Sequence, residues 1–283
     1  MKLPFRPNLT GKVAVVTGGS GVLCSDFCRA LAQCGAKVAI INRNLEKGQA
    51  LEQEICQAGG TAKAFSADVT NEESICAVYT AVTETFGPCH ILINGAGGNN
   101  HKATTDDEFF DQEVLESPEK KSFFDLDLSG FTTVFGVNMN GVFLPTRYFA
   151  REMTLAGSGV IVNISSLNAF TPLTKIPAYS AAKAAVSNFT QWLSVYLAKS
   201  GVRVNAIAPG FFSTQQNKAL LWNPDGTPTA RSGKILRGTP IKRFGKPEEL
   251  LGTLLWLVDD ASSSFVTGVV VPVDGGFSAY SGV

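Results

Sequence analysis

The chain has 283 residues, of which 45% are hydrophobic and 17% charged, and its 24 Lys and Arg residues balance its 24 Asp and Glu residues. This balance argues against nucleic-acid binding through a basic stripe and against a disordered charged arm, and the composition suits one globular domain. The N-terminal residues lack the apolar stretch of a secretory signal and the later apolar runs are too short to span a bilayer, so we expect a cytoplasmic protein without nucleic-acid or membrane partners.

Short apolar runs alternate along the chain with segments of helical pattern. Runs of strand length occupy residues 12–17, 38–41, 62–65, 91–93, 160–164, 202–206 and 269–271. Helical patterns cover residues 23–34, 45–58 and 72–86. Strands that alternate with helices form βαβ units and a parallel sheet. The sequence therefore predicts one α/β domain over residues 1–283, with a Rossmann-type doubly wound sheet and helices on both faces.

Two connections interrupt this alternation. Residues 99–130 are polar and charged with several phenylalanines, and residues 215–245 carry three prolines and several cations. Connections of this length inside a compact domain are usually functional or disordered. We expect an inserted segment at 99–130 and a substrate lid at 215–245, both at the mouth of an active site. The alternative is that both are inert insertions.

All six cysteines lie between Cys24 and Cys89, none of them in a Cys-x-x-Cys pair, and the chain has two histidines. This spacing indicates no metal site. Cys24 and Cys28 are four residues apart on an expected helix. In a reducing compartment we expect both to be small buried apolar residues.

A glycine-rich turn, Thr17–Cys24, joins the first strand to the first helix. Glycines let the backbone approach a diphosphate, and the free N–H groups of a helix N-terminus favour its negative charge. We expect this turn to bind a dinucleotide. The residues expected to contact it are Gly18, Ser20, Gly21, Val22 and Leu23.

The end of the second strand, about 20 residues further on, is where a dinucleotide fold meets the adenine ribose. Asn42 and Arg43 stand there in place of an acidic residue that would repel a 2′-phosphate. The guanidinium therefore favours NADP(H) over NAD(H). Asn42 can also bond the 2′-hydroxyl of NAD(H), and Arg43 can be solvated, so both cofactors stay open.

Tyr179 and Lys183 are four residues apart on an expected helix, so the phenol and the ammonium share one face. A free tyrosine has a pKa of about 10, and a nearby cation lowers that value toward neutral pH. The pair therefore suits general acid–base chemistry. The same spacing also occurs by chance in many helices.

Together these residues resemble the short-chain dehydrogenase/reductase family, and the resemblance runs from Leu9 to Phe277. The motifs that carry it are the glycine turn, Asp68-Val69, Asn94-Gly95-Ala96-Gly97, Asn138-Met139-Asn140-Gly141, Ser166, Tyr179 with Lys183, Pro209-Gly210 with Thr214, and Asp274-Gly275-Gly276. The chain departs from the family pattern at Val22 and Cys24, which replace glycines, and at Gly95, which replaces an asparagine. Residues 99–130 also exceed the family's usual length.

The resemblance implies an NAD(P)-dependent oxidoreductase that interconverts a carbonyl and an alcohol and needs no metal. It implies Tyr179 as the general acid or base, Ser166 as the group that holds the reacting oxygen, and Lys183 as the group that lowers the Tyr179 pKa and binds the nicotinamide ribose. It implies a water on Asn138 that links Lys183 to solvent. The cofactor contacts that it implies are Asp68, Val69, Asn94, Ala96, Gly97, Tyr179, Lys183, Pro209, Gly210, Phe212 and Thr214.

We expect a polyhydroxylated carboxylate of sugar-acid size as the substrate. Hydroxyl-rich ligands need polar partners, which the sequence offers at Asn99, Asn100, His101 and Asn168, beside Ser166 and Tyr179. The expected lid adds Gln215, Gln216, Asn217, Arg231, Lys234, Arg237, Lys242 and Arg243, among which an arginine best matches a carboxylate. Residues 96–105, 209–217 and 277–283 resemble bacterial proteins assigned as D-mannonate oxidoreductases, which implies the D-fructuronate/D-mannonate pair.

Three other functions remain as alternatives. They are a gluconate- or polyol-type dehydrogenase of the same family, a reductase of acyl-carrier-linked or steroid-like substrates, and a dinucleotide-sensing protein without catalysis. A sensor would have no reason to keep Asn138, Ser166, Tyr179 and Lys183 together. Family members commonly assemble through two long helices, here 131–156 and 178–199, which implies a homotetramer or homodimer.

Overall fold

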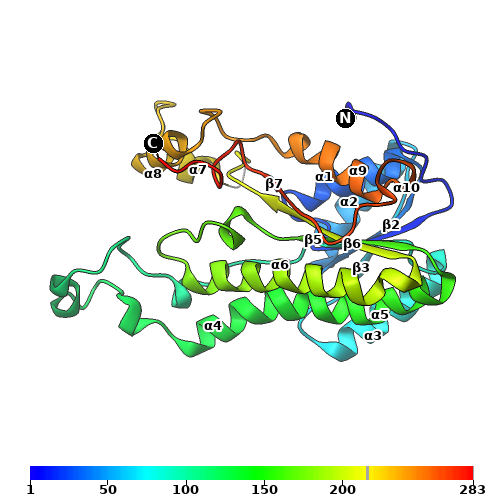
Figure 1. Cartoon of the computed structure of the whole chain (residues 1–283), viewed down its shortest axis with the longest axis horizontal. Helices are drawn as coiled ribbons and strands as arrows, with labels where there is room; N and C mark the ends of the chain where they lie inside the picture. The colour runs from blue at the N-terminus through cyan, green and yellow to red at the C-terminus, as the bar shows by residue number, and fades with distance from the viewer. Residues whose placement is uncertain (215–216, 283) are drawn as a thin grey trace.

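The structure is built on one parallel sheet (Figure 1). The computed structural model describes residues 1–214 and 217–282, and within them seven strands pair in the order β3-β2-β1-β4-β5-β6-β7. The strands are β1 (Val13–Thr17), β2 (Lys37–Asn42), β3 (Thr61–Ser66), β4 (Ile91–Asn94), β5 (Gly159–Ile164), β6 (Val202–Pro209) and β7 (Val270–Val273). The strand order reverses between β1 and β4, so the predicted doubly wound sheet is confirmed.

Helices cover both faces of the sheet (Figure 1). One face carries α1 (Cys24–Gln33), α2 (Leu45–Gln57) and α9 (Leu251–Val258). The other carries α3 (Glu72–Phe86), α5 (Gly141–Ala156) and α6 (Pro177–Leu197). The shorter helices are α4 (Leu128–Phe135), α7 (Lys218–Leu221), α8 (Ala230–Gly238) and α10 (Asp260–Ser263). In the described part of the chain, no helix combines the length and the apolar character that crossing a membrane requires.

The elements differ from the predicted ranges mainly at their ends. β6 continues to Pro209, beyond the predicted end at residue 206, because Ile207 to Pro209 pair with β7. The predicted helix 131–156 begins earlier, at Leu128, where the Asp127 side chain accepts a hydrogen bond from the Ser129 N–H. A π-helical turn at Gly136–Asn140 also interrupts it and separates α4 from α5.

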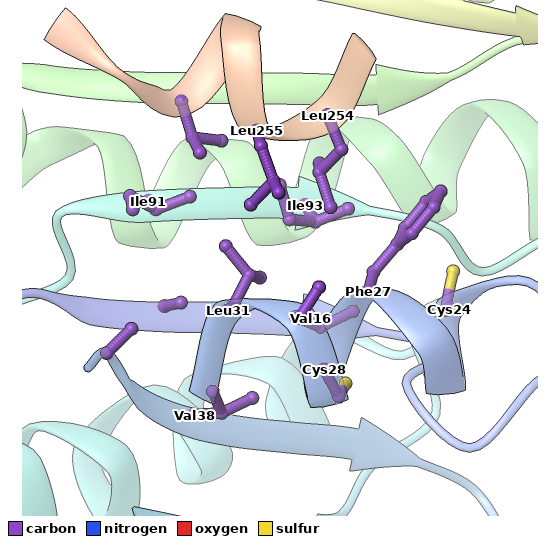
Figure 2. Packing of buried hydrophobic residues seen from close by; sticks show 14 of the residues in the cluster. Val16, Cys24, Phe27, Cys28, Leu31, Val38, Ile91, Ile93, Leu254 and Leu255 are labelled. Atoms are coloured by element: carbon purple, nitrogen blue, oxygen red, sulfur yellow. The ribbon is translucent and has the colours of Figure 1, made fainter. Parts of the chain in front are cut away.

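An apolar cluster packs α1 and α9 side by side against one face of the sheet (Figure 2). Phe27 of α1, Ile93 of β4 and Leu255 of α9 belong to it, and each is fully buried. Burying a side chain of this size stabilises the fold by about 1.5–3 kcal/mol. Cys24 and Cys28 lie in the same cluster, which confirms that they are small buried residues.

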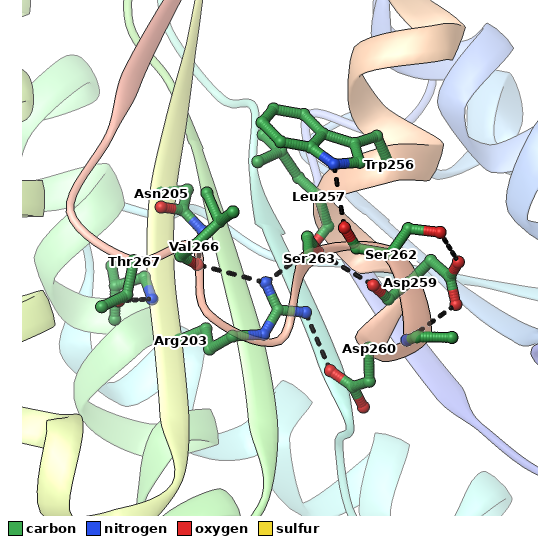
Figure 3. A network of polar contacts seen from close by, with 12 residues as sticks. Arg203, Asn205, Trp256, Leu257, Asp259, Asp260, Ser262, Ser263, Val266 and Thr267 are labelled. Atoms are coloured by element: carbon green, nitrogen blue, oxygen red, sulfur yellow. Dashed lines mark hydrogen bonds and ion pairs between the residues drawn. The ribbon is translucent and has the colours of Figure 1, made fainter.

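A polar network fixes the start of β6 and the loop that leads to β7 (Figure 3). Arg203 is largely buried, and its guanidinium donates to the carbonyls of Leu257 at 3.0 Å and Val266 at 3.4 Å. The same group pairs with Asp260 at 2.8 Å. Asn205 donates to the Val266 carbonyl at 2.9 Å. These contacts satisfy a buried charge and lie at the end of β6 away from Pro209, so we assign them a structural role.

Candidate active site

A large cavity opens at the carboxyl ends of the strands, where parallel α/β sheets bind their ligands. Its volume is about 1080 Å³, and we call it the cofactor cleft. The predicted cofactor residues that line it are Gly18, Ser20, Gly21, Val22, Asn42, Arg43, Asp68, Val69, Ala96 and Gly97. The rest of its described lining is Asn44, Lys47, Ala67, Thr70, Gly95, Thr132, Thr133, Gly136, Val137 and Asn140.

The glycine turn brings main chain to the wall of the cleft. Gly18 has a φ of +64°, and a Cβ atom there would lie 2.9 Å from the backbone of Ala96, so a larger residue does not fit. A Cβ atom at Gly21 would meet the Gly18 carbonyl oxygen at 2.9 Å. No side chain caps the N-terminus of α1 at Leu23, which leaves N–H groups for a diphosphate. The turn therefore fits a dinucleotide even though Val22 and Cys24 replace two glycines.

Asn42 ends β2 with a buried amide oxygen that has no hydrogen-bond partner among the described residues. Its amide nitrogen donates to the Asn44 carbonyl. A buried acceptor without a donor costs roughly 1–3 kcal/mol, and a ribose hydroxyl would supply that donor. Arg43 and Lys47 line the same cleft and add two cations. The residues present therefore fit the ribose of either nicotinamide cofactor.

Asp68 adds an ionised carboxylate to the cleft. Thr70 donates its hydroxyl and its N–H to the Asp68 carboxylate at 2.7 and 2.9 Å. These hydrogen bonds, assisted by the charge of Arg43, hold the pKa of Asp68 below its ordinary value. A carboxylate near Arg43 partly offsets the guanidinium charge, which weakens the attraction of Arg43 for a phosphate.

Residues 95–98 form a shelf along the cleft that side chains support from two directions. The Thr17 hydroxyl oxygen accepts hydrogen bonds from the N–H groups of Gly95 at 3.1 Å and Ala96 at 3.3 Å. The Asn138 amide oxygen accepts a hydrogen bond from the Gly98 N–H at 3.4 Å. This shelf explains why predicted residues Ala96 and Gly97 face the cleft.

Asn94 lies beneath the shelf and is not part of the described cleft lining. Its amide donates to the hydroxyl of Thr146 at 2.9 Å and to the amide oxygen of Asn163 at 2.8 Å. Asn163 in turn donates to the Thr190 hydroxyl at 2.9 Å. This network turns the Asn94 side chain toward β5 and α5, and the predicted cofactor contact at Asn94 stays a prediction.

Asn138 is fully buried and holds the shelf from the side of the π-helical turn. Its amide nitrogen donates to the carbonyls of Gly98 at 2.7 Å and Val134 at 2.8 Å. A Cβ atom at Gly97 would lie 2.7 Å from Asn138 Oδ1 and 3.2 Å from Lys183 Nζ. Gly97 is therefore the point at which these two predicted residues meet.

Tyr179, Ser166 and Lys183 come together where β5 ends and α6 begins. Lys183 Nζ lies 5.7 Å from the centroid of the Tyr179 ring and donates to the Ile164 carbonyl at 2.7 Å. Ser166 follows shortly after β5, and its hydroxyl interacts with the Tyr179 phenol. The structure thus brings all three predicted side chains to one place.

Burial shifts the pKa values of Tyr179 and Lys183. It raises the pKa of Tyr179, against the opposing hydrogen bond from Ser166, and it lowers the pKa of Lys183 to about 8. The predicted lowering of the Tyr179 pKa is not found in this structure, because desolvation of the phenolate dominates. Tyr179 is therefore a protonated phenol at neutral pH and is suited to donate a proton.

Asn168 holds the Ser166 hydroxyl in position through a hydrogen bond. The Asn168 N–H donates to the Ser166 hydroxyl oxygen at 3.2 Å, and its side-chain amide donates to the Ser180 hydroxyl at 3.2 Å. Asn168 is buried, because Ser166 caps a short 3-10 helix, Leu167–Ala169, that turns Asn168 inward. These contacts give Asn168 a positioning role toward Ser166, and the predicted substrate contact at Asn168 stays a prediction.

Asn99, Asn100 and His101 begin the inserted segment. The Asn99 amide donates to the Thr104 hydroxyl at 3.0 Å, and the Asn100 side chain accepts from the Lys102 N–H at 2.9 Å. His101 is exposed. These hydrogen bonds stay within the turn, and among the described residues none links the three to Ser166 or Tyr179.

Residues 99–127 form an arm that extends away from the sheet (Figure 1). The Thr105 N–H donates to the Lys175 carbonyl at 2.9 Å, which ties the base of the arm to the segment before α6. Beyond that tie, both carboxylate oxygens of Glu108 lie 2.9 Å from Lys234 Nζ on α8. The arm and α8, which are far apart in sequence, are thus joined by an ion pair.

Residues 217–245, which we call the α7–α8 unit, fold against the start of their own segment. Leu221, Ile235 and Phe244 form a small apolar cluster inside the unit. The Gly245 N–H donates to the Phe211 carbonyl at 2.9 Å, which brings the chain back to where the unit begins. Gln215 and Gln216, predicted as part of a lid, lie outside the described residues.

A second cavity, which we call the lateral pocket, lies between the α7–α8 unit and the glycine turn. Its volume is about 340 Å³. It is lined by the predicted cofactor residues Val22, Leu23, Gly210, Phe212 and Thr214, and by Phe211, Asn217, Leu220, Leu221, Arg231, Ile235 and Phe244. Val22 lines both cavities, so the lateral pocket adjoins the cofactor cleft. Pro209 is buried as the last residue of β6.

Several residues of the cleft were not predicted from the sequence. Lys47 lies four residues after Arg43 at the start of α2, and this second cation was an available signal. Asn140 belongs to the motif that contains Asn138. Thr132 and Thr133 carry no recognisable signal, because their position depends on how α4 crosses the cleft.

The arrangement suits proton exchange with an oxygen atom beside a bound dinucleotide. Ser166 and Tyr179 offer hydroxyl groups to such an oxygen, and Lys183 places an amine with a pKa of about 8 next to them. Within residues 1–214 and 217–282, no three His, Cys, Asp or Glu side chains gather as metal ligands. A bound nicotinamide would supply the hydride chemistry.

The family model and the relative that match this chain both describe oxidoreductases. The chain matches the family model for short chain dehydrogenase over residues 12–224. It is 57% identical over 281 residues to an uncharacterised oxidoreductase, UxuB, of Bacillus subtilis (strain 168), and the match covers 99% of this chain and 100% of that protein.

Solved structures of two bacterial proteins superpose on this chain. The first, from Haemophilus influenzae with bound NAD, is provisionally assigned as a D-mannonate oxidoreductase; it has a TM-score of 0.93 at 55% identity and 98% coverage of both chains. The second is a gluconate 5-dehydrogenase of Burkholderia cenocepacia J2315 in complex with NADP and tartrate. It has a TM-score of 0.81 at 29% identity, covering 96% of this chain and 97% of that chain.

Proposed function

Because this chain belongs to the short-chain dehydrogenase family and is an NAD(P)-dependent oxidoreductase of CH–OH groups, we propose that it interconverts a ketone and a secondary alcohol on a sugar acid. The proposed pair is D-fructuronate and D-mannonate. The observation that carries this proposal is the 55% identity, over 98% of both chains, to the Haemophilus influenzae protein assigned to D-mannonate. The gluconate 5-dehydrogenase is much less similar, at 29% identity.

In the proposed mechanism, Ser166 and Tyr179 hold the reacting oxygen between their hydroxyl groups. A bound NAD(P) supplies the hydride donor or acceptor. In reduction, the Tyr179 hydroxyl proton passes to the substrate oxygen as the carbonyl carbon becomes an alcohol carbon. In oxidation the transfer runs in reverse: Tyr179 must first lose its own proton, and its phenolate then takes the substrate hydroxyl proton as the carbinol carbon loses its hydride. Asn168 keeps the Ser166 hydroxyl in place for both directions.

Lys183 and Asn138 serve proton transfer in this proposal. The Lys183 ammonium stands beside the Tyr179 ring, so it stabilises the phenolate that forms during reduction. Its pKa of about 8 lets it exchange a proton near neutral pH. Asn138 lies against the same glycine, Gly97, and takes the role of holding the water that connects Lys183 to solvent.

We propose that the enzyme accepts both nicotinamide cofactors. The unpartnered amide oxygen of Asn42 suits the ribose 2′-hydroxyl of NAD(H). Arg43 and Lys47 suit the 2′-phosphate of NADP(H), and Asp68 moderates the charge of Arg43. The sequence favours NADP(H) because of Arg43, and the Asn42 amide oxygen supports binding of NAD(H) as well. Similar proteins bind NAD in one solved structure and NADP in the other.

We also propose that the enzyme is a homo-oligomer that assembles through α5 and α6. Trp192 and Tyr196 on the outer side of α6 are 57% and 69% exposed, and their rings stack at 5.1 Å. Phe143 of α5 joins the same row of rings through Phe189. Large exposed aromatic groups that lie side by side commonly mark protein interfaces. Trp192→Glu should lower the mass measured by light scattering.

The substrate proposal is tested by initial-rate assays with D-mannonate, D-mannitol and D-gluconate at saturating NAD⁺ and NADP⁺. We expect kcat/KM for D-mannonate to exceed that for the other two at least tenfold. Equal oxidation of D-mannitol would mean that no carboxylate is recognised and would end the proposal. A higher kcat/KM for D-gluconate would replace it with the second candidate, a gluconate-type dehydrogenase.

A further inference from the structure

The cationic side chains of the α7–α8 unit differ in whether they already form an ion pair. Lys234 pairs with Glu108, and Arg243 pairs with Glu249 through two nitrogens at 2.7 and 2.6 Å. Arg231 has no carboxylate within ion-pair distance among the described residues. Its charge acts on Glu108 from beyond that distance and helps to lower the pKa of that carboxyl group. No direct ion pair within the described residues occupies the Arg231 guanidinium, so it can bind an anion from solution.

Arg231 also stands where a substrate would reach it. It lines the lateral pocket together with Gly210, Phe212 and Thr214, which are expected beside the cofactor. Val22 joins this pocket to the cofactor cleft. A substrate that presents its alcohol carbon to a nicotinamide can therefore extend into the lateral pocket.

The walls of the lateral pocket strengthen the attraction between opposite charges that meet there. Most of the described lining is apolar, including Phe211, Leu221 and Phe244, and Arg231 is its one charged residue. The Asn217 side chain is already engaged, since it donates to the Phe212 carbonyl at 2.8 Å and accepts from the Thr214 N–H at 2.8 Å. Arg231 is an exposed residue of α8, and the side of an ion pair that faces these apolar walls is less screened than one in open water. Arg231 is thus the group in this pocket best suited to an anion.

The neighbouring ion pair keeps α8 in position for this task. Arg231 and Lys234 are three residues apart on α8, so they lie on adjacent parts of its surface. Glu108 uses both carboxylate oxygens on Lys234. The arm therefore anchors α8 through Lys234, and within the described part of the chain the Arg231 guanidinium donates no hydrogen bond.

We propose that Arg231 is the specificity-determining residue that binds the carboxylate of the substrate, an inference that rests on the proposed sugar-acid function. The planar guanidinium matches the two oxygens of a carboxylate with two parallel hydrogen bonds. This contact selects acids over neutral polyols of the same length. It also fixes which end of the substrate lies away from Tyr179.

Steady-state kinetics of Arg231→Gln and Arg231→Lys test the proposal. Arg237→Gln is the matched control, because Arg237 is exposed on the same helix, as Arg231 is, but is not part of the described lining of the lateral pocket. Removing a hydrogen bond to a charged group weakens binding about tenfold to a hundredfold. We expect KM for D-mannonate to rise by that factor in Arg231→Gln and by less in Arg231→Lys. The oxidation of D-mannitol and the behaviour of Arg237→Gln should stay unchanged. Thermal melting verifies that each variant is folded.

NADH binding, measured by fluorescence, distinguishes the substrate carboxylate from the cofactor diphosphate. An equal loss of NADH affinity in Arg231→Gln would assign the guanidinium to the diphosphate and overturn the proposal. An unchanged KM for D-mannonate would overturn it as well. If the wild-type enzyme prefers D-gluconate, the comparison is repeated with D-gluconate and D-glucitol, so that an error in the sugar acid is separated from an error about Arg231. A wild-type enzyme with equal kcat/KM for the acids and the polyols would refute both the sugar-acid function and the role of Arg231.

Discussion

The side chain of Cys24 fills the space that a side chain at position 95 would need, so a Cβ atom on Gly95 would overlap Cys24 Sγ. Two departures from the family pattern, a cysteine for a glycine and a glycine for an asparagine, are therefore one coupled change. Burial raises the pKa of Cys24 to about 12, so its thiol is neutral at physiological pH and acts as a packing group.

A double-mutant cycle on Cys24 and Gly95 should reveal this coupling. Gly95→Ala overpacks the site and should lower the free energy of unfolding by about 1–3 kcal/mol. The same change made in Cys24→Gly should cost less, because the overlap with Cys24 Sγ is then removed and only the contact with the Thr17 carbonyl oxygen, at 2.9 Å, remains. We expect a coupling energy of about 0.5–3 kcal/mol. Urea denaturation measures all four proteins. Gly98→Ala is the control, since a Cβ atom there meets nothing within 4 Å. Additive costs would show that the two sites are independent.

Tyr179→Phe should remove the proton donor while leaving the cofactor cleft intact. We expect kcat to fall by about 10²–10⁴-fold, the usual contribution of a general acid–base group, with NADH affinity unchanged. Tyr196→Phe is a matched control on the exposed side of the same helix and should keep full activity. A Tyr179→Phe enzyme with more than about a tenth of wild-type kcat would remove Tyr179 from the mechanism.

Lys183→Met should stabilise the protein without cofactor at neutral pH. Burial lowers the Lys183 pKa from 10.5 to about 8, so below pH 8 both the folded and the unfolded chain carry the ammonium and its burial costs stability. That displacement corresponds to roughly 3 kcal/mol as an upper limit. Between about pH 8 and pH 10.5 the unfolded chain binds more protons, so the free energy of unfolding of the wild type should rise with pH.

The advantage of Lys183→Met should therefore be largest at pH 7 and shrink toward pH 10.5. Urea denaturation at pH 7, 9 and 10.5 measures it, with the exposed Lys199→Met as control. A stability difference that does not change with pH would show that Lys183 is not held at a lowered pKa.

Arg43→Ala should affect the two cofactors unequally. If Arg43 meets the 2′-phosphate, KM for NADPH should rise about tenfold or more while KM for NADH changes little. Asn42→Asp should act in the same direction, because a carboxylate accepts the 2′-hydroxyl of NADH and repels the phosphate. Lys63→Ala, which changes an exposed side chain on the edge strand β3, is the control. Parallel changes for both cofactors would place Arg43 beside the adenine only.

Much of the fold was predictable because its signals are local. Buried parallel strands such as β1 and β5 appear in the sequence as short apolar runs, and α3 was predicted at its observed ends. The end of β6 was missed because its last residues depend on pairing with β7, which lies far along the chain. A pairing of that kind leaves no pattern within β6 itself.

The site was predictable where residue type and spacing suffice, as for Tyr179 and Lys183, which the structure brings together with Ser166. The positioning role of Asn168 was not predicted, because the sequence does not show the turn that directs its amide to Ser180. In the sequence, Arg231 is one of several equivalent cations. It is distinguished by its place in the lateral pocket and by the pairing of Lys234 with Glu108 and of Arg243 with Glu249, and both are properties of the folded chain.

The position of Asn138 depends on the number of residues in the π-helical turn Gly136–Asn140. Each residue turns an α-helix by about 100°, so deleting one residue here would restore a regular helix and rotate α4 relative to α5. Asn138 could then no longer donate to both Gly98 and Val134. Most exchanges of one amino acid for another on the outer face of this helix would leave that geometry intact. Natural variation in this stretch should therefore consist of substitutions, with insertions and deletions selected against.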